Sequence, residues 1–318
     1  MKPVEYSQYF FSIEYKNRLF KHKQPNCTNT TKMLGFHAYI DKGIPAAFES
    51  TTNYDDIAAV QIFFRSPQAI NTKHREFSDA DFDAREKFIG IDLLSHSPYR
   101  MNLAKTVLKP NSPEVLMIHD DMVCNDDFGG FGTVIHIGSN TLKLPVEDAM
   151  KIAVDNINMI IETYPAYAKK FGIKNPAAKL ILENNAREGN KIFWEIDSLP
   201  PIASGGDSIG YCLDTQHLFA SGYDVSSIPK CEDLIRKFDE TVGKKRLSVI
   251  HLNDSEVKLD GRRDRHDKIG SGKIWSDDKS SLRFWAKLSR DLNIPLILET
   301  GKVDHTPEFG YITDALKK

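Results

Sequence analysis

A loop between His251 and Trp275 combines metal-ligand residue types with arginines. It reads HLNDSEVKLDGRRDRHDKIGSGKIW, and Asp264 and His266 stand two residues apart in its basic centre. Carboxylates and imidazoles are zinc ligands, whereas the guanidinium fork of arginine suits phosphate oxygens. A solvated basic loop would explain the arginines alone but not the Asp and His among them. We therefore expect the loop to hold metal on one side and a phosphodiester on the other. The arginines concerned are Arg262, Arg263 and Arg265.

Further residues of the same types close short apolar runs along the chain. They are His96, His136, Glu183, Asp214, His217, His251 and Glu299. A single His at a strand end is more often a hydrogen-bonded structural residue than a ligand. Several ionisable groups buried at one rim, however, cost several kcal/mol for each unpaired charge. Metal ions remove that cost, because carboxylates and neutral imidazoles then become ligands.

Together with Asp264 and His266, these residues make a set of nine candidate ligands. A catalytic zinc ion takes three ligands from protein and leaves a position open. Nine ligands with one shared carboxylate therefore predict three zinc ions, and the carboxylates would allow manganese at one position. Two ions about 3.5 to 4 Å apart would clamp the attacking and leaving oxygens of a phosphodiester, and the third would add positive charge.

Eight nearly continuous apolar runs must position these residues. The runs begin at Met33, Ala59, Phe88, Gly132, Ala178, Ile209, Leu247 and Ile294. Continuous runs are typical of strands covered on both faces of a parallel sheet. The stretches between them have helical periodicity, most clearly from Pro145 to Thr163. Eight such units predict a (β/α)8 TIM barrel, in which the carboxyl ends of the strands meet at one mouth. The alternative, an open doubly wound sheet, lacks its glycine-rich phosphate-binding motif here.

Composition restricts where and how the protein works. The chain has 318 residues, of which 41% are hydrophobic and 27% charged, and no apolar run is long enough to span a membrane. Four scattered cysteines without a CxxC pair argue against thiolate zinc sites and disulfides, so we expect an intracellular protein. The net charge of −2 means that a polyanion must be bound by a local basic patch.

Five segments resemble the endonuclease IV family of apurinic/apyrimidinic endonucleases. They are LENNAREG from Leu182, CLDTQHLFASGYD from Cys212, HLNDS from His251, DRHDKIGSGKI from Asp264 and PLILET from Pro295. The resemblance covers roughly residues 33 to 310. It implies a TIM barrel with three zinc ions, which hydrolyses double-stranded DNA on the 5′ side of an abasic site. The products would be a 3′-hydroxyl and a 5′-deoxyribose phosphate, and blocked 3′ ends would also be trimmed.

The resemblance also implies how the nine ligands divide among the three ions. The first ion would be held by His96, His136 and Glu183, and Glu183 would bridge to the second. The second would also take Asp214, His251 and Glu299, and the third would take His217, Asp264 and His266. Glu183 and Glu299 would be the catalytic carboxylates.

This sequence departs from the family at one position beside a ligand and at one position where DNA would be contacted. Gln216 replaces a frequent cysteine between Thr215 and His217, and Gln68 stands where the family often has an arginine. Tyr99 matches the family's inserting aromatic residue, with Arg100 beside it. The expected DNA contacts are therefore Gln68, Tyr99, Arg100, Arg262, Arg263 and Arg265.

Two other functions fit part of the pattern. A sugar isomerase or epimerase also places carboxylates and histidines at a barrel mouth, but it needs only one or two divalent metal ions. A catalytically silent protein that binds damaged DNA would keep the ligands for structure alone. Whatever the function, we expect a monomeric barrel domain over residues 33–318, preceded by a basic N-terminal extension over residues 1–32. That extension would be a flexible tail or, alternatively, an arm on DNA.

Overall fold

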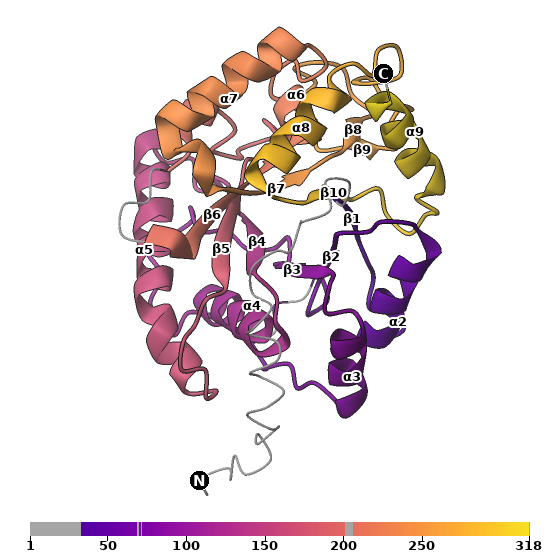
Figure 1. Cartoon of the computed structure of the whole chain (residues 1–318). Helices are drawn as coiled ribbons and strands as arrows, with labels where there is room; N and C mark the ends of the chain where they lie inside the picture. The colour runs from indigo at the N-terminus through magenta and orange to yellow at the C-terminus, as the bar shows by residue number, and fades with distance from the viewer. Residues whose placement is uncertain (1–32, 69, 71, 201–205, 318) are drawn as a thin grey trace, which may run out of the picture.

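The structure, a computed structural model, describes residues 33–317 except 69, 71 and 201–205. Its centre is a closed barrel of eight parallel strands in the order β1-β10-β7-β6-β5-β4-β3-β2 (Figure 1). The strands are β1 (Leu34–His37), β2 (Ala59–Ile62), β3 (Asp92–His96), β4 (Gly132–His136), β5 (Lys179–Glu183), β6 (Ile209–Asp214), β7 (Leu247–His251) and β10 (Leu296–Leu298). Each of the eight apolar runs supplies one strand, so the predicted (β/α)8 TIM barrel is confirmed.

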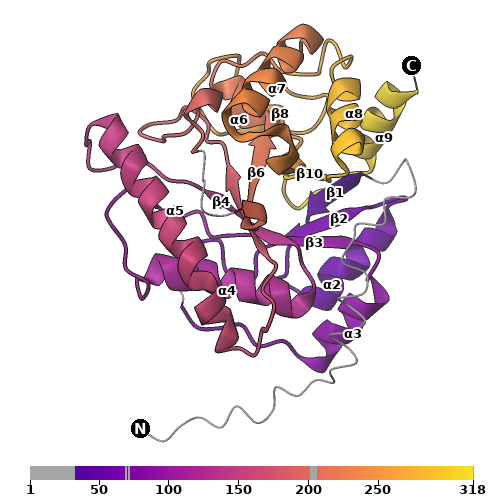
Figure 2. The same ribbon diagram turned by 60° about the vertical axis from the view of Figure 1, so that its left-hand side comes forward.

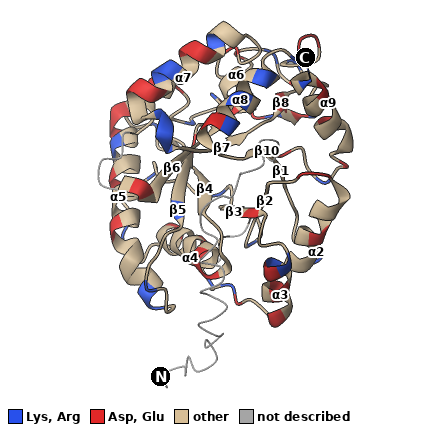
Figure 3. Ribbon diagram, in the orientation of Figure 1, with Lys and Arg blue, Asp and Glu red and all other residues tan. Residues whose placement is uncertain are grey.

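Helices surround the barrel, as the two ribbon views show (Figures 1 and 2). They are α2 (Ile44–Glu49), α3 (Asp79–Lys87), α4 (Pro113–Phe128), α5 (Val146–Lys169), α6 (Thr215–Ala220), α7 (Ile228–Val242), α8 (Leu282–Leu292) and α9 (Thr306–Leu316). Lys and Arg are interspersed with Asp and Glu over these helices (Figure 3). Among the described residues, no helix has the length and apolar character needed to cross a membrane.

The long helix α5 extends further than its sequence pattern predicts. It begins directly after Pro145, as expected, but it continues beyond Thr163 to Lys169 and includes Pro165. The buried face continues through Tyr164 and Ala168, and this packing outweighs the local cost of a proline. Tertiary contacts therefore decide where this helix ends.

The inside of the barrel contains one small apolar cluster. Its members come from seven different strands: Ala59, Leu94, Val134, Ile181, Cys212, Val249 and Ile297. On the eighth strand, β1, the place is taken by Gly35, where an added Cβ would lie 2.3 Å from the carbonyl oxygen of Ala59. Because side chains alternate along a strand, the residue two positions further on faces the same interior, nearer the mouth.

The expected N-terminal extension lies outside the described residues. In the described part, β1 is hydrogen-bonded to β2 on one side and to β10 on the other, so the barrel closes on its own strands.

Removing residues 1–30 should therefore leave the barrel folded. We expect the thermal unfolding midpoint to change by less than about 3 °C, the shift that roughly 1 kcal/mol causes in a domain of this size. Circular dichroism melting measures it. A matched deletion through residue 40 removes β1 and should abolish cooperative unfolding. Loss of soluble protein in the shorter deletion would contradict the prediction.

Candidate metal centre

A layer of polar side chains lies two residues beyond the apolar interior on every strand. Its members are His37, Gln61, His96, His136, Glu183, Asp214, His251 and Glu299. Six of them are ligands expected from the sequence, and all six lie at or just after a strand end. The period-two alternation of the strands therefore brings residues from six separate segments into one interior space.

The first group of ligand atoms belongs to His96, His136 and Glu183. Oε2 of Glu183 lies 3.2 Å from Nε2 of His96 and 3.5 Å from Nδ1 of His136. Nδ1 of His96 donates to the carbonyl oxygen of Ser97 at 2.7 Å. That bond leaves the lone pair of His96 Nε2 facing the group.

The second group shares Glu183 with the first. Its ligand atoms come from Glu183, Asp214, His251 and Glu299 and lie within 4.8 Å of one another. Nδ1 of His251 is 3.1 Å from Oε1 of Glu183 and 3.0 Å from Oε2 of Glu299. Each oxygen of Glu183 thus faces a different group, which is the geometry a bridging carboxylate needs. Asn253 donates to Asp214 at 2.7 Å and to Glu299 at 3.2 Å.

The third group comes from the end of β6, from α6 and from β9 (His266–Asp267), which pairs with β8 (Asp254–Ser255) in a small ribbon. Its ligand atoms belong to Asp214, His217 and His266. His217 is in the first turn of α6, where its backbone N–H donates to Asp214, rather than at a strand end. Asp264 lies 3.2 Å from Nε2 of His217 and 3.5 Å from Nε2 of His266. The nine expected ligands therefore come together, with Asp214 between the second and third groups.

Several ring nitrogens in these groups make no hydrogen bond although they are buried. They are Nδ1 of His136, Nε2 of His217 and Nε2 of His266. Buried polar atoms normally have a hydrogen-bond partner. Unsatisfied imidazole nitrogens beside carboxylates are what a divalent metal ion would satisfy, so the donor set fits a metal of the zinc type.

The pKa values of the same groups reflect burial and mutual pairing. Burial lowers the pKa of His136 to about 3, so this imidazole is neutral and can act as a ligand. Burial alone would raise the pKa of Glu183, but the imidazole of His251, 3.1 Å from its Oε1, holds it well below its usual value. Burial also opposes protonation of His217, yet Asp214 and Asp264 raise its pKa to about 10. A divalent cation would take over the role of these protons.

The loops expected to contact DNA are placed around the metal-ligand groups. Tyr99 is 52% exposed, and its ring lies 5.3 Å from that of Phe63 and 6.0 Å from that of His136. The backbone N–H of Tyr99 donates to the carbonyl oxygen of Pro67, so the loops after β2 and β3 are joined. Gln68 and Arg100 are exposed beside it.

The arginine loop is exposed but less free than the sequence suggests. Arg262 makes two hydrogen bonds of 3.1 Å to the carboxylate of Asp260, and Arg265 donates to the carbonyl oxygen of Asp264. Lys191 adds a positive charge that the sequence interpretation missed, because its Nζ lies 2.9 Å from Asp264. Binding of a phosphodiester by Arg262 would have to compete with Asp260.

The sequence interpretation also missed Gln61 and Asn253, which hydrogen-bond to the ligands. Gln61 interrupts the apolar run of β2, and Asn253 follows His251 by two residues. The position of Gln61, two residues after an interior alanine, would have indicated that it faces the mouth.

Comparisons with known proteins agree with the fold and identify the family. The family described as the xylose isomerase-like TIM barrel matches residues 55–306. The chain is 31% identical to a probable endonuclease 4 from Methanosphaera stadtmanae, over 84% of this chain and 92% of that protein. It is 29% identical to a probable endonuclease 4 from Carboxydothermus hydrogenoformans, over 89% and 94% of the two chains.

Solved structures give a similar result. Endonuclease IV from Thermus thermophilus superposes with a TM-score of 0.68 and 27% identity, over 90% of this chain and 97% of that one. A D-tagatose 3-epimerase-like protein has a TM-score of 0.65 but only 16% identity, over 90% and 97%. The second likeness concerns the fold alone.

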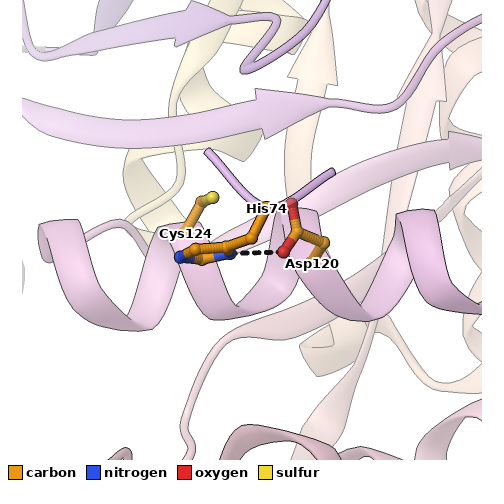
Figure 4. Close-up of side chains that lie close together, drawn as sticks. All are labelled: His74, Asp120 and Cys124. Atoms are coloured by element: carbon orange, nitrogen blue, oxygen red, sulfur yellow. Dashed lines mark hydrogen bonds and ion pairs between the residues drawn. The ribbon is translucent and has the colours of Figure 1, made fainter. Parts of the chain in front are cut away.

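One further group of possible ligands lies outside the mouth and consists of His74, Asp120 and Cys124 (Figure 4). Asp120 accepts hydrogen bonds from His74 and from Arg65, whose guanidinium also pairs with Asp121 at 2.8 Å. Burial raises the pKa of the Cys124 thiol well above its usual value, which keeps the sulfur protonated. Because the Arg65 guanidinium already pairs with both carboxylates, we assign no metal ion to this group.

Replacing Arg65 with Met should destabilise the fold strongly, because two fully buried carboxylates lose their cation. We expect the free energy of unfolding to fall by about 3 to 5 kcal/mol in urea titrations. Arg236→Met is a matched control, since Arg236 also pairs with two carboxylates but on the exposed side of α7. It should change stability far less. Equal losses of stability in the two variants would show that the buried ion pairs contribute no more than the exposed ones.

Proposed function

The chain belongs to the endonuclease IV family within the xylose isomerase-like TIM barrels, and on this premise we propose that it is a zinc-dependent apurinic/apyrimidinic endonuclease. Its substrate is double-stranded DNA that contains an abasic site. The phosphodiester is hydrolysed on the 5′ side, which leaves a 3′-hydroxyl and a 5′-deoxyribose phosphate, and 3′ blocks are also removed. The observation that carries the proposal is the set of three adjoining ligand groups, two of which share Glu183.

Nine side chains divide the work of holding three metal ions. His96, His136 and Glu183 would hold the first ion, and Glu183, Asp214, His251 and Glu299 the second. Asp214 or Asp264 would complete the third with His217 and His266. Zinc bound there supplies positive charge on the phosphate oxygens and a water molecule of lowered pKa. Manganese would be tolerated at one of the positions.

The protein's own groups position water and DNA for the reaction. Water attacks phosphorus, the bond from phosphorus to the upstream O3′ breaks, and that O3′ takes up a proton. The side chain of Glu299 is 13% exposed and that of Glu183 only 1%. We therefore assign orientation of the attacking water to Glu299, whereas Glu183 would be shared by the first and second ions.

Selection of an abasic site follows from the shape of the mouth. The ligands lie inside the barrel, so the target nucleotide must leave the base stack to reach them, and this costs least where no base is paired. Tyr99, exposed beside His136, is placed to fill the gap in the duplex. Gln68 and Arg100 would contact the backbone nearby, and Arg263 and Arg265 would do so from the opposite loop.

The alternative function is that of a sugar epimerase with one or two metal ions, and a specific observation disfavours it. The third ligand group, with Asp264 and the arginines of the same loop, has no use in that reaction. A non-catalytic protein that binds damaged DNA is distinguished only by measuring turnover.

The protein purified without chelators should contain about three zinc ions per chain. Nine ligands with a shared carboxylate are sufficient for that number. Inductively coupled plasma mass spectrometry measures it. One ion or fewer, together with activity that survives strong chelators, would rule out the trinuclear site.

A labelled duplex with one abasic analogue should be cut on the 5′ side of the lesion, whereas the matched intact duplex should not. The reason is that the free-energy cost of moving a nucleotide out of the stack is larger in an intact duplex than at an abasic site. Denaturing gels identify the product ends.

Glu299→Gln is the control for that experiment, because it keeps the shape of the side chain but removes a negative ligand. We expect its turnover to fall by orders of magnitude, while binding of the duplex is largely kept. Cutting of both duplexes, or a 3′-unsaturated sugar as product, would overturn the assigned reaction.

A further inference from the structure

Two members of the polar layer, His37 and Gln61, have no place among the nine metal ligands. They face each other in register on the neighbouring strands β1 and β2. Gln61 is completely buried and His37 is 6% exposed. An amide buried at the bottom of a metal centre is costly unless it is hydrogen-bonded, so its contacts indicate what it does there.

The amide of Gln61 contacts three side chains of the layer. Its Oε1 lies 2.9 Å from Nε2 of His251. Its Nε2 lies 2.7 Å from Oε1 of Glu299 and 3.1 Å from Nδ1 of His37. The side chain of Gln61, on β2, thus links the ends of β1 and β7 and the residue that follows β10.

The chemistry of the partners fixes which way the amide points. The Glu299 carboxylate can only accept, so the amide nitrogen must face it. Nδ1 of His37 lies 3.1 Å from the same amide nitrogen, which can only donate, so this ring nitrogen accepts the second amide hydrogen. The amide oxygen is then left for His251, which must carry a hydrogen on Nε2 to donate to it.

This hydrogen bond determines which nitrogen of His251 is available to a metal ion. With the hydrogen held on Nε2, the lone pair is on Nδ1, the atom that faces Glu183 and Glu299. The other amide contact holds Oε1 of Glu299, which leaves Oε2 of Glu299 turned toward His251 Nδ1 at 3.0 Å. Ligand histidines commonly have their second nitrogen fixed in this way.

We propose that Gln61 is a positioning residue of the second metal position, where its single amide fixes both the tautomer of His251 and the orientation of Glu299. The proposal rests on the proposed function, since it assumes that these two residues bind metal. It assigns a role to a residue that touches neither the metal nor the substrate.

Gln61→Met tests the proposal, because methionine has a similar shape but cannot replace either hydrogen bond. We expect the affinity of one of the three zinc positions to fall by about 10- to 100-fold, as for other residues that orient ligands. After dialysis against a moderate chelator, zinc content should fall from about three to about two ions per chain, while the wild type keeps all of its zinc. Competition with a chromophoric chelator measures the affinity.

Asn156→Leu is the matched control for loss of a buried amide. Asn156 on α5, one of the surrounding helices, makes three hydrogen bonds of 2.8 Å, to the backbone of Leu103, Thr106 and Leu108, and none of these partners is a candidate ligand. Both variants should melt at lower temperature, but only Gln61→Met should lose zinc affinity. Unchanged zinc affinity in Gln61→Met, or an equal loss in Asn156→Leu, would overturn the proposal.

A second measurement needs no variant. Long-range ¹H–¹⁵N NMR spectra of the zinc-loaded wild type report which nitrogen of His251 carries hydrogen. A hydrogen on Nε2 is expected, and a hydrogen on Nδ1 would overturn the proposal even if Gln61→Met failed to fold. Cleavage of abasic DNA by the wild type, combined with either contrary result, would reject the role of Gln61 and leave the proposed function standing. A wild type that binds no zinc would overturn both.

Discussion

The buried carboxylate of Glu183 is the interaction on which the arrangement of the mouth depends. It is 1% exposed and ends β5, and its two oxygens face different pairs of side chains. An isolated carboxylate at that depth would be protonated or would destabilise the fold. The imidazoles of His96, His136 and His251 compensate for it, and they come from three other strands. Compensation of the Glu183 charge therefore requires that β3, β4, β5 and β7 bring their last residues to the same level of the barrel.

The barrel meets that requirement through the alternation of its strands. On seven strands an apolar residue faces the interior, and on the eighth Gly35 takes that place. The residue two positions further along each strand belongs to the polar layer. The interior is narrow at Gly35, because an added Cβ would also lie 2.7 Å from Cδ1 of Ile297. The same apolar layer that closes the barrel below the site also excludes water from beneath the ligands. Their mutual attractions are correspondingly stronger than they would be in solvent.

Other polar groups hold the surrounding segments where the chemistry needs them. The carboxylate of Asp254 accepts backbone N–H groups from Gly270, Gly272 and Ile274, which anchors the loop that carries His266. On the other side of the mouth, Arg65 and Ser97 both bind Asp121 of α4, so the segments that lead to Gln68 and to Tyr99 are attached to one helix. Asp254 and Asp121 are both buried, and each has the hydrogen bonds that a buried carboxylate needs to be held in one arrangement.

Much of this site could be predicted from the sequence, because strand ends in a parallel barrel converge. The eight apolar runs predicted the eight strands, and the His, Asp and Glu residues that end them predicted which side chains meet at the mouth: His96, His136, Glu183, Asp214, His251 and Glu299. Asp264 and His266 were predicted from residue type and spacing in a basic loop. Local pattern was sufficient for these residues, since the period of a strand and the direction of a barrel fix where such side chains go.

The remaining features were decided only by tertiary structure. The position of Gln61 after Ala59 indicates only which face it occupies, because its role depends on His251 and Glu299, which follow it by 190 and 238 residues. The placement of His217 on a helix, the position of Asp214 between two ligand groups, and the pairing of Arg262 with Asp260 are likewise properties of the packed chain. Sequence pattern reports which face a residue occupies, whereas hydrogen bonds between distant segments are set by the distances and angles that folding creates.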